Sequence, residues 1–222
     1  MRILVIDVGG THIKLLAAGQ RVPIKIPSGP DMTPKKMARL ARAALAQAGW
    51  RFDVVSIGYP GPIRRGKPAA DPHNLGKGWV GFDFRRAFGC PVRVINDAAM
   101  QALGSYTGGR MLFLGFGTGL GSALIIDGQL EPLELGHLPY KKGLTYEDYV
   151  GTAGLKRMGK KKWRRHALAI IDLFTFALQA DSVVVGGGNA KLLPELPKGV
   201  RRGSNTNAFL GGFRLWKGRR AP

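Results

Sequence analysis

The stretch ILVIDVGGTHIKLLAAGQ, residues 3–20, contains two apolar runs separated by an acidic residue, two glycines and a threonine. Short apolar runs bounded by glycine predict buried β-strands, here at 3–7 and 12–18. Gly9 and Gly10 allow the chain to turn tightly between these strands. The stretch therefore predicts a hairpin that places polar groups at the end of a buried strand.

The stretch LGFGTGLGSALIIDGQ, residues 114–129, repeats this pattern later in the chain. At an offset of 109 positions, Gly10, Leu15, Gly19 and Gln20 fall on identical residues. The strand, glycine turn and strand also recur in the same order. The repeat predicts an α/β protein of two related lobes that face one cleft.

The rest of the sequence fits this α/β pattern. A helix is expected after Thr33, with Pro34 in its first turn and Gly49 as its end. The other expected elements are strands at 22–26, 53–62, 91–97 and 181–188, helices after Asp97 and at 163–180, and a helix near the C-terminus. We expect an N-terminal lobe of residues 1–95, completed by 206–222, and a C-terminal lobe of residues 96–205.

The composition predicts a cytoplasmic protein without a membrane span. The chain has 222 residues, of which 45% are hydrophobic, and Cys90 is its single cysteine. One cysteine excludes an internal disulfide framework and a cysteine-rich zinc cluster. The N-terminus does not have the pattern of a signal peptide. No apolar run approaches the ~20 residues that a membrane-spanning helix needs.

The net charge of +20 arises from 34 basic and 14 acidic residues. Such an excess attracts polyanions, among them nucleic acid, polyphosphate and nucleotide phosphates. A high net charge also keeps proteins soluble without any specific partner. The charge alone leaves both interpretations open.

The two glycine turns have the composition of phosphate-binding loops. Glycine lets several backbone amides approach one anion, and the hydroxyls of Thr11 and Thr118 add donors. Asp7, at the end of its strand, could orient Mg²⁺ or its water ligands against the phosphates. The alternative is that both are ordinary hairpin turns.

VINDAAMQALG, residues 94–104, places Asn96 and Asp97 where a strand meets a helix. A carboxylate there can accept the proton of an attacking hydroxyl group, which phosphoryl transfer requires. Asn96 offers a donor and an acceptor that suit a sugar hydroxyl. The alternative is that Asp97 is simply the N-cap of the helix.

Glu134 and His137 lie three residues apart in EPLELGHLPY, residues 131–140. If both point into the cleft, they can bind neighbouring hydroxyl groups of a pyranose. As metal ligands they would lack the third protein ligand that a zinc site needs. They could also be an ordinary surface glutamate and loop histidine.

Six motifs occur in the order that is typical of the ROK sugar kinases, and the chain resembles their short branch, the polyphosphate glucokinases. The motifs are DVGGTHIK, GYPGP, INDAAMQALG, GFGTGLGSALIIDGQ, LELGHLPY and VVVGGGNA. The resemblance covers most of the chain from Ile3 to about Asn189 and weakens across 141–165.

The resemblance implies a two-lobed, actin-like ATPase (ribonuclease H-like) fold with a central cleft. It implies that Asp97 is the catalytic base and that the hexose is held by Asn96, Glu134 and His137. Asp7 would also be the residue nearest to Mg²⁺. The implied phosphate and donor-binding residues are Asp7, Gly9, Gly10 and Thr11, then Gly117, Thr118 and Gly119, with Gly186, Gly187 and Gly188 beside the nucleoside if ATP is the donor.

The chain departs from many ROK kinases in one segment. These kinases carry a cysteine-rich zinc motif soon after the Glu–His pair, whereas KKGLTYEDYVG, residues 141–151, has no cysteine. The polyphosphate branch also lacks the motif, so we expect no structural zinc. A sugar-binding acid that commonly accompanies the zinc segment is not assigned by the motifs; Glu147 is a candidate.

The segment KRMGKKKWRRH, residues 156–166, contains seven Lys or Arg residues and no acid. It predicts either a solvated loop with a first helical turn or a track for an extended polyanion, since a polyphosphate chain would benefit from many cationic contacts. The residues of this predicted track are Lys156, Arg157, Lys160, Lys161, Lys162, Arg164 and Arg165.

Together these patterns predict a hexose kinase, with glucose as the expected sugar and ATP, polyphosphate or both as the donor. We expect it to need Mg²⁺, to form a homodimer and to bind no membrane. The alternative is a nucleic-acid-binding or regulatory ROK-like protein without kinase activity. Against it, Trp163 is the only aromatic residue in the main basic run, and the phosphate motif begins too early to follow a DNA-binding domain.

Overall fold

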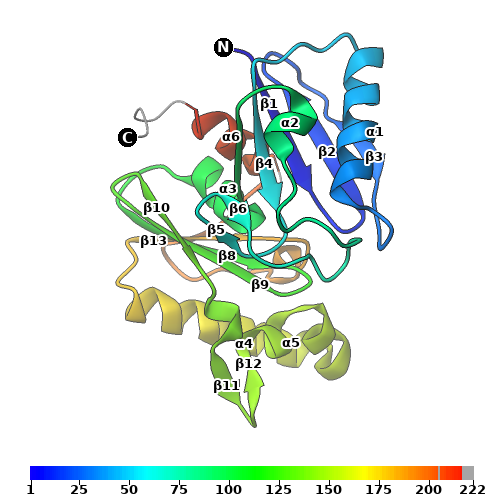
Figure 1. The fold of residues 1–222 in the computed structure, drawn as a ribbon. Helices are drawn as coiled ribbons and strands as arrows, with labels where there is room; N and C mark the ends of the chain where they lie inside the picture. The colour runs from blue at the N-terminus through cyan, green and yellow to red at the C-terminus, as the bar shows by residue number, and fades with distance from the viewer. Residues whose placement is uncertain (205, 217–222) are drawn as a thin grey trace. The chain divides into compact units, whose positions relative to one another are not determined.

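The computed structural model describes residues 1–204 and 206–216. The chain divides into two compact units. Unit 1 contains Met1–Met100 and the described residues from Ala208 onward, and unit 2 contains Gln101–Asn207. Each unit is built around its own five-stranded sheet (Figure 1).

The sheet of unit 1 begins with the predicted hairpin. Strand β1 pairs antiparallel with β2, which pairs antiparallel with β3, and on its other side β1 pairs parallel with β4, which pairs parallel with β7. The strand order is β3-β2-β1-β4-β7, with bounds Ile24–Pro27, His12–Ala17, Ile3–Val8, Val54–Tyr59 and Val92–Asn96. All five strands were predicted from the sequence, within one to three residues at their ends. The buried strand β1 therefore lies at the centre of the sheet.

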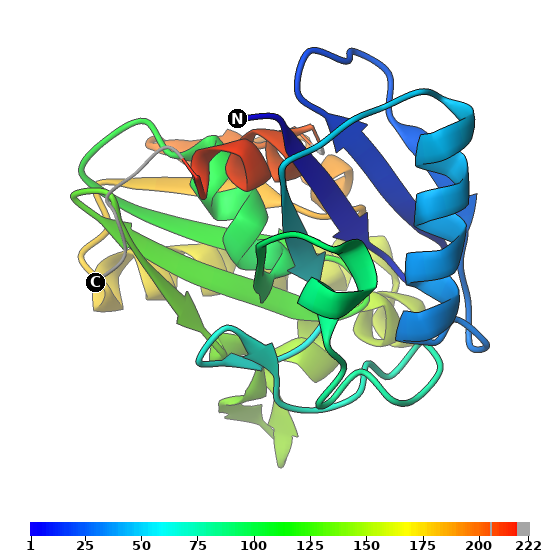
Figure 2. The ribbon, with the colours of Figure 1, turned by 45° about the horizontal axis from the view of Figure 1, so that its top comes forward.

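Helices cover both faces of this sheet (Figure 2). Helix α1 (Pro34–Gln47) has Thr33 as its N-cap, whose hydroxyl accepts a hydrogen bond from the Lys36 amide at 3.2 Å. Its apolar side packs with α2 (Phe84–Phe88) against one face of the sheet. On the other face, α6 (Asn207–Arg214) packs against Val5 and other residues of β1, β2 and β4. The predicted C-terminal helix thus completes the core of unit 1; residues 217–222 of the predicted lobe lie outside the described residues.

The segment that joins β4 to α2 contains more structure than the polar loop that the sequence predicts. It includes the short hairpin β5 (Ile63–Arg64) and β6 (Lys67–Pro68). The Asp71 carboxylate then accepts hydrogen bonds from the amides of Trp79 at 2.8 Å and Gly78 at 3.1 Å. These bonds lower the pKa of Asp71. Because Trp79 is fully buried, the loop is anchored to the core at this point.

The sheet of unit 2 repeats the topology of the first sheet. Its order is β10-β9-β8-β13-β14, with bounds Gln129–Leu133, Leu120–Ile126, Arg110–Phe116, Ser182–Gly186 and Val200–Arg202. In each unit the first three strands form an antiparallel meander, and the fourth and fifth strands join parallel to the first. The internal repeat seen in the sequence is therefore a repeat of the whole sheet topology.

The helices of unit 2 include the long helix α5 (Thr152–Ala177), whose buried side chains Trp163, Ile170 and Phe174 pack on the sheet. The helix starts eleven residues earlier than the sequence predicts and is broken at Gly159, where φ is 75°. Before it lie the hairpin β11 (Pro139–Lys141) and β12 (Leu144–Thr145) and the short helix α4 (Tyr146–Val150). In the described part of the chain, no helix has the length and apolar character that crossing a membrane requires.

Candidate functional site

The first glycine turn follows β1 and carries Gly9, Gly10 and Thr11. The Gly9 amide donates to the His12 carbonyl at 3.1 Å, and a Cβ on Gly9 would lie 2.9 Å from that oxygen, so the turn has no room for a side chain there. The Ser28 amide donates to the Thr11 carbonyl at 2.8 Å. Gly10 and Thr11 are exposed at the tip. The turn is thus fixed at its base and open at its tip, as a phosphate-binding loop requires.

Asp7 is a nearly buried carboxylate beside this turn. Its Oδ2 lies 3.2 Å from Nζ of Lys14 on the neighbouring strand β2, and its side chain is 12% exposed. Lys14 was not singled out from the sequence, although a cation inside the apolar run HIKLLA indicates a paired charge. One carboxylate that is already paired cannot form a metal cage by itself. It does fit Mg²⁺ that arrives with phosphate groups and keeps most of its water ligands.

Asn96 and Asp97 lie where β7 ends and α3 (Asp97–Ser105) begins, and both are half-buried. Oδ1 of Asn96 accepts hydrogen bonds from the amides of Ala98 at 2.9 Å and Ala99 at 3.1 Å, so Asn96 is the N-cap of α3. Oδ1 of Asp97 accepts a hydrogen bond from the Ala98 amide at 2.8 Å. The alternative in which Asp97 is simply the N-cap is therefore wrong, because its neighbour caps the helix.

The capping role limits what Asn96 can offer a sugar. Its Oδ1 already accepts two hydrogen bonds, and its Nδ2 donates to the Gly61 carbonyl at 3.2 Å. An amide nitrogen has two hydrogens, so one donor remains for a ligand. The bond to Gly61 also connects this corner to the GYPGP segment, residues 58–62.

The second glycine turn, residues 117–119, joins β8 to β9 in unit 2. The Gly117 amide donates to the Gly119 carbonyl at 3.0 Å. The Gly117 carbonyl accepts hydrogen bonds from Oγ1 of Thr152 at 2.9 Å and from Nδ2 of Asn189 at 3.0 Å. Thr118 is exposed at the tip, as Thr11 is in the first turn. The start of α5 and the chain after β13 therefore hold this turn in place.

Glu147 of α4 also contacts the second turn. Its Oε2 accepts a hydrogen bond from the Leu120 amide at 3.2 Å, and a Cβ on Gly119 would lie 1.9 Å from that oxygen. Thr152, Asn189 and Glu147 were not assigned to this turn from the sequence. Their contacts depend on segments distant in the chain, so only the acidic character of Glu147 gave a signal.

Gly186 and Gly187 end β13 against the neighbouring strand. A Cβ on Gly186 would lie 2.6 Å from the Phe113 ring, and one on Gly187 would lie 2.3 Å from the Phe116 carbonyl. Gly187 also has φ of +80°, which glycine adopts without strain. Close packing therefore accounts for these two glycines, whereas Gly188 is exposed.

Glu134 and His137 lie beside each other at the start and end of a short 3-10 helix, Leu135–His137. Nδ1 of His137 is 3.6 Å from Oε2 of Glu134, and the side chains are 66% and 56% exposed, respectively. A Cβ on Gly136 would lie 2.6 Å from the Leu120 carbonyl, so this helix packs directly against the strand that follows the second turn. The pair is thus exposed and close to that turn within unit 2.

The alternative that this pair binds a metal has no support in the described residues, where no three His, Cys, Asp or Glu side chains come together in a possible metal site.

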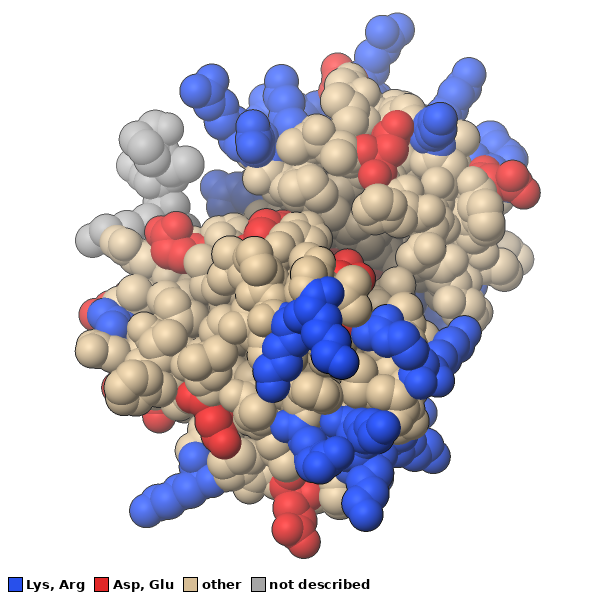
Figure 3. All heavy atoms as spheres, turned by 90° about the horizontal axis from the view of Figure 1, so that it is seen from below, with Lys and Arg blue, Asp and Glu red and all other residues tan. Residues whose placement is uncertain are grey.

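The predicted polyanion track lies on both sides of the break in α5. Two of its members are held by the fold: Arg157 donates to the Asp148 carbonyl at 2.7 Å, and Arg164 to the Leu192 carbonyl at 2.5 Å. The exposed members for which the described part of the chain provides no such bond are Lys156, Lys160, Lys161, Lys162 and Arg165. Figure 3 shows the molecule from below the view of Figure 1, from the side where α4 and the β11–β12 hairpin lie. Basic side chains are prominent on this face.

Comparisons with known proteins identify the family. The ROK family model matches residues 3–143. The polyphosphate glucokinase of Mycobacterium tuberculosis is 30% identical over 207 residues, which cover 82% of this chain and 76% of that protein.

Among solved structures, the inorganic polyphosphate/ATP-glucomannokinase of Arthrobacter sp. strain KM has a TM-score of 0.78 and 26% identity, covering 96% of this chain and 97% of the other. A ROK glucokinase of Streptomyces griseus, solved with glucose and AMPPNP, has a TM-score of 0.76 at 17% identity, covering 97% and 99% of the two chains. These similarities confirm the predicted actin-like ATPase fold. Because the family model matches more than half of its residues, the chain belongs to the ROK family.

Proposed function

We propose that this protein is a hexose kinase that transfers a phosphoryl group from ATP or polyphosphate to the 6-hydroxyl of a hexose, with glucose as the favoured sugar. The observation that carries this proposal is the carboxylate of Asp97 at the start of α3, in a chain that is 30% identical to a polyphosphate glucokinase. The glucomannokinase and glucokinase neighbours agree with a sugar substrate.

Asp97 is proposed to be the general base. Its Oδ1 is fixed by the Ala98 amide, and the N-terminus of α3 favours a negative charge there. An ionised carboxylate within hydrogen-bond reach of the sugar hydroxyl accepts the proton as the oxygen attacks the terminal phosphorus. The proton moves to Asp97, the new P–O bond forms, and the bond to the rest of the donor breaks.

The hexose is proposed to bind through three side chains. Asn96 offers the one amide hydrogen that the cap leaves available. Glu134 and His137 are exposed, lie 3.6 Å apart and present an acceptor and an imidazole to neighbouring hydroxyl groups. Such contacts orient the reacting hydroxyl, which is the main contribution of binding to phosphoryl transfer.

The donor phosphates are proposed to bind at the tips of the two glycine turns, where backbone amides and the hydroxyls of Thr11 and Thr118 are donors. Lys14 and Asp7 lie beside the first of these turns. Mg²⁺ bound with the donor would neutralise phosphate charge, and Asp7 is the carboxylate suited to orient its water ligands. Gly188 is proposed to lie beside the nucleoside when ATP is the donor, with Gly186 and Gly187 shaping the strand end.

The Asp97→Asn variant tests the proposed base. Oδ1 of asparagine can still accept the hydrogen bond from the Ala98 amide, so the fold should be retained while the base is lost. We expect kcat to fall by roughly 10²- to 10⁴-fold, with a much smaller change in KM for the sugar.

The measurement is a steady-state assay of sugar phosphate formation. Asp172→Asn, which changes an exposed carboxylate of α5 in the same way, is the matched control and should keep the wild-type rate. Near wild-type turnover by Asp97→Asn would exclude the assigned role.

A further inference from the structure

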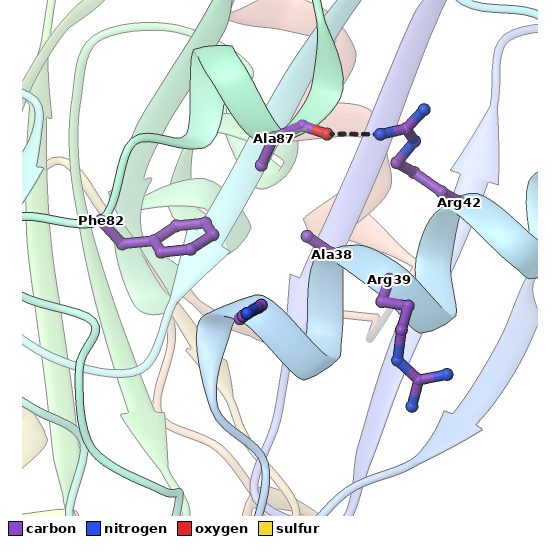
Figure 4. Close-up of a pocket in the computed structure, with 6 residues that line it drawn as sticks. Ala38, Arg39, Arg42, Phe82 and Ala87 are labelled. Atoms are coloured by element: carbon purple, nitrogen blue, oxygen red, sulfur yellow. Dashed lines mark hydrogen bonds between the residues drawn. The ribbon is translucent and has the colours of Figure 1, made fainter.

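A groove on unit 1 lies apart from every residue to which the proposed function assigns a role. It has a volume of about 300 Å³ and lies between α1 on one side and Phe82 and α2 on the other (Figure 4). The small side chains of Ala38 and Ala87 face each other across it. The groove is therefore open enough to receive a narrow ligand.

Three cations line the α1 side of this groove: Lys35, Arg39 and Arg42. Residues spaced by four and three positions share one face of a helix, so they form a row about 10 Å long. We call these three residues the α1 row. All are exposed, and within residues 1–204 and 206–216 none of them forms an ion pair with a carboxylate. The row is thus a strip of uncompensated positive charge.

The groove is partly pre-organised for a ligand. Nη1 of Arg42 donates to the Ala87 carbonyl at 3.4 Å, which holds its side chain over the groove (Figure 4). The Phe82 ring packs edge-on against Phe84, with a centroid distance of 4.9 Å, and forms a fixed wall. Fixed side chains lose less conformational entropy when a ligand binds.

The α1 row begins at the end of unit 1 that carries the first glycine turn. Strands β1 and β3 both run antiparallel to β2, so their carboxyl ends lie at the same end of the sheet. The first glycine turn follows β1 and helix α1 follows β3, so the turn and the start of α1 lie at this end (Figure 1). The segment 74–76 joins them: Asn74 lies against Gly10, and the Gly76 amide donates to the Met32 carbonyl at 3.1 Å, next to the N-cap of α1. The row therefore leads away from a proposed phosphate-binding turn.

We propose that the α1 row binds the distal part of an inorganic polyphosphate chain whose terminal phosphate lies at the first glycine turn. This inference rests on the proposed function and names the part of the donor that the row recognises. A polyphosphate chain carries about one negative charge per phosphate and has no bulky base, so it matches a narrow groove lined by alanines and spaced cations. Single-stranded nucleic acid would need several aromatic platforms, and Phe82 is the only aromatic residue among the described residues that line the groove.

Charge reversal tests the row through its dependence on chain length. In the double variant Lys35→Glu/Arg39→Glu, we expect kcat/KM for long polyphosphate to fall about tenfold, because two attractive contacts become repulsive. Tripolyphosphate has only two phosphates beyond the one transferred, so we expect it to be affected far less. The loss should shrink at high ionic strength, since the cations are exposed. The Arg39 side chain is exposed and makes no hydrogen bond within the described residues, so Arg39→Glu alone is a second variant with little risk to folding.

The matched control is Arg21→Glu, which reverses an exposed charge of unit 1 outside the groove. Reversal of Lys160, Lys161 and Lys162 tests the rival track on α5. The proposal is overturned if Arg21→Glu has the same effect, if long and short chains lose activity equally, or if the α5 variant alone abolishes the preference for long chains.

Binding of fluorescently labelled long-chain polyphosphate to the full chain, followed by anisotropy, separates this proposal from the proposed function. If the wild-type protein binds long-chain polyphosphate but phosphorylates no sugar, the kinase proposal is contradicted and the binding role of the α1 row is not. In the opposite case, the wild-type protein phosphorylates glucose with ATP but binds long-chain polyphosphate no better than the double variant does. That result would contradict the role of the α1 row and leave the kinase proposal intact. The same anisotropy assay is repeated with an RNA of the same length. If the double variant weakens RNA binding as much as polyphosphate binding, the row attracts polyanions in general, and the proposal is overturned.

Discussion

Ser56 shows how single residues determine the core of unit 1. Its hydroxyl is fully buried, donates to the Gly212 carbonyl of α6 at 2.6 Å and accepts from Nε1 of Trp216 at 2.8 Å. The sequence places Ser56 in a buried strand, and a polar residue in such a strand indicates a specific partner. The identity of that partner, more than 150 residues away, could not be read from the local pattern.

Ser56→Ala should destabilise unit 1 without touching the proposed site. The substitution leaves a buried carbonyl and a partly buried indole N–H without their partner. Each such group costs about 1–3 kcal/mol when it stays unsatisfied, and we expect a total loss of ~2 kcal/mol. Urea denaturation measures the change in the free energy of unfolding. Thr107→Val, which removes an exposed hydroxyl, is the control and should change it by less than about 0.5 kcal/mol. Equal stability of both variants would contradict the bonding role of Ser56.

Asn96 and Asp97 mark the limit of prediction at the residue scale. Their place at a strand end was read from the sequence, because an apolar run meets a helical pattern there. The sequence could not show which of the two residues caps the helix, since Asn and Asp are almost equally good N-caps. The hydrogen bonds from the Ala98 and Ala99 amides to Oδ1 of Asn96 show that Asn96 is the cap.

Helix α5 shows the same limit at the scale of elements. Its second part was predicted from apolar periodicity, but its first part was assigned to a basic loop because charged residues and Gly159 obscure the pattern. The structure shows a helix there because Leu155 and Met158 pack against the core of unit 2. Tertiary packing thus overrides weak local propensity. The short elements β11, β12 and α4 had no periodic signal long enough to predict.

His166 connects α5 to the segment before it and makes the stability of unit 2 depend on pH. Its Nδ1 lies 3.1 Å from the Tyr140 hydroxyl, and its ring packs against Tyr149. Burial lowers the pKa of His166 below its usual value, and the positive charges of Lys141 and Arg165 add to this effect. A lowered pKa means that the unfolded chain takes up the proton more readily.

We therefore expect unit 2 to be fully stabilised by His166 above pH 6.5 and to lose this contribution as the pH falls through the lowered pKa. Thermal unfolding between pH 7.5 and 5 measures the slope, and His166→Phe should flatten it. His73→Phe, at an exposed loop histidine, is the control. A slope that His166→Phe leaves unchanged would show that other groups cause it.

At the scale of the whole molecule, the internal repeat predicted the topology. Four identities and a shared strand–turn–strand pattern predicted two related units, and both sheets have the same order and strand directions. The glycine turns were found for the same reason, because glycine and threonine at a strand end give a local signature. The supporting contacts of Glu147, Thr152 and Asn189 came only with the structure, since they join segments distant in sequence. The contact of Lys14 with Asp7 lies within one hairpin, and the cation in an apolar strand was its signal.

The α1 row was missed for a different reason. Lys35, Arg39 and Arg42 look like the ordinary solvated face of an amphipathic helix, and basic residues are frequent in this chain. Their significance depends on Phe82 and Ala87, which close the other side of the groove. A row of charges becomes a candidate site only when an opposite wall is known.

The central claim is that the chain phosphorylates a hexose. The most direct measurement incubates the purified protein with each pair from a set of hexoses and the donors ATP and polyphosphate, with and without Mg²⁺, and detects sugar phosphate by ³¹P nuclear magnetic resonance. We predict glucose 6-phosphate from at least one donor, formed only with Mg²⁺ and lost in Asp97→Asn. The absence of any sugar phosphate with every pair would contradict the account.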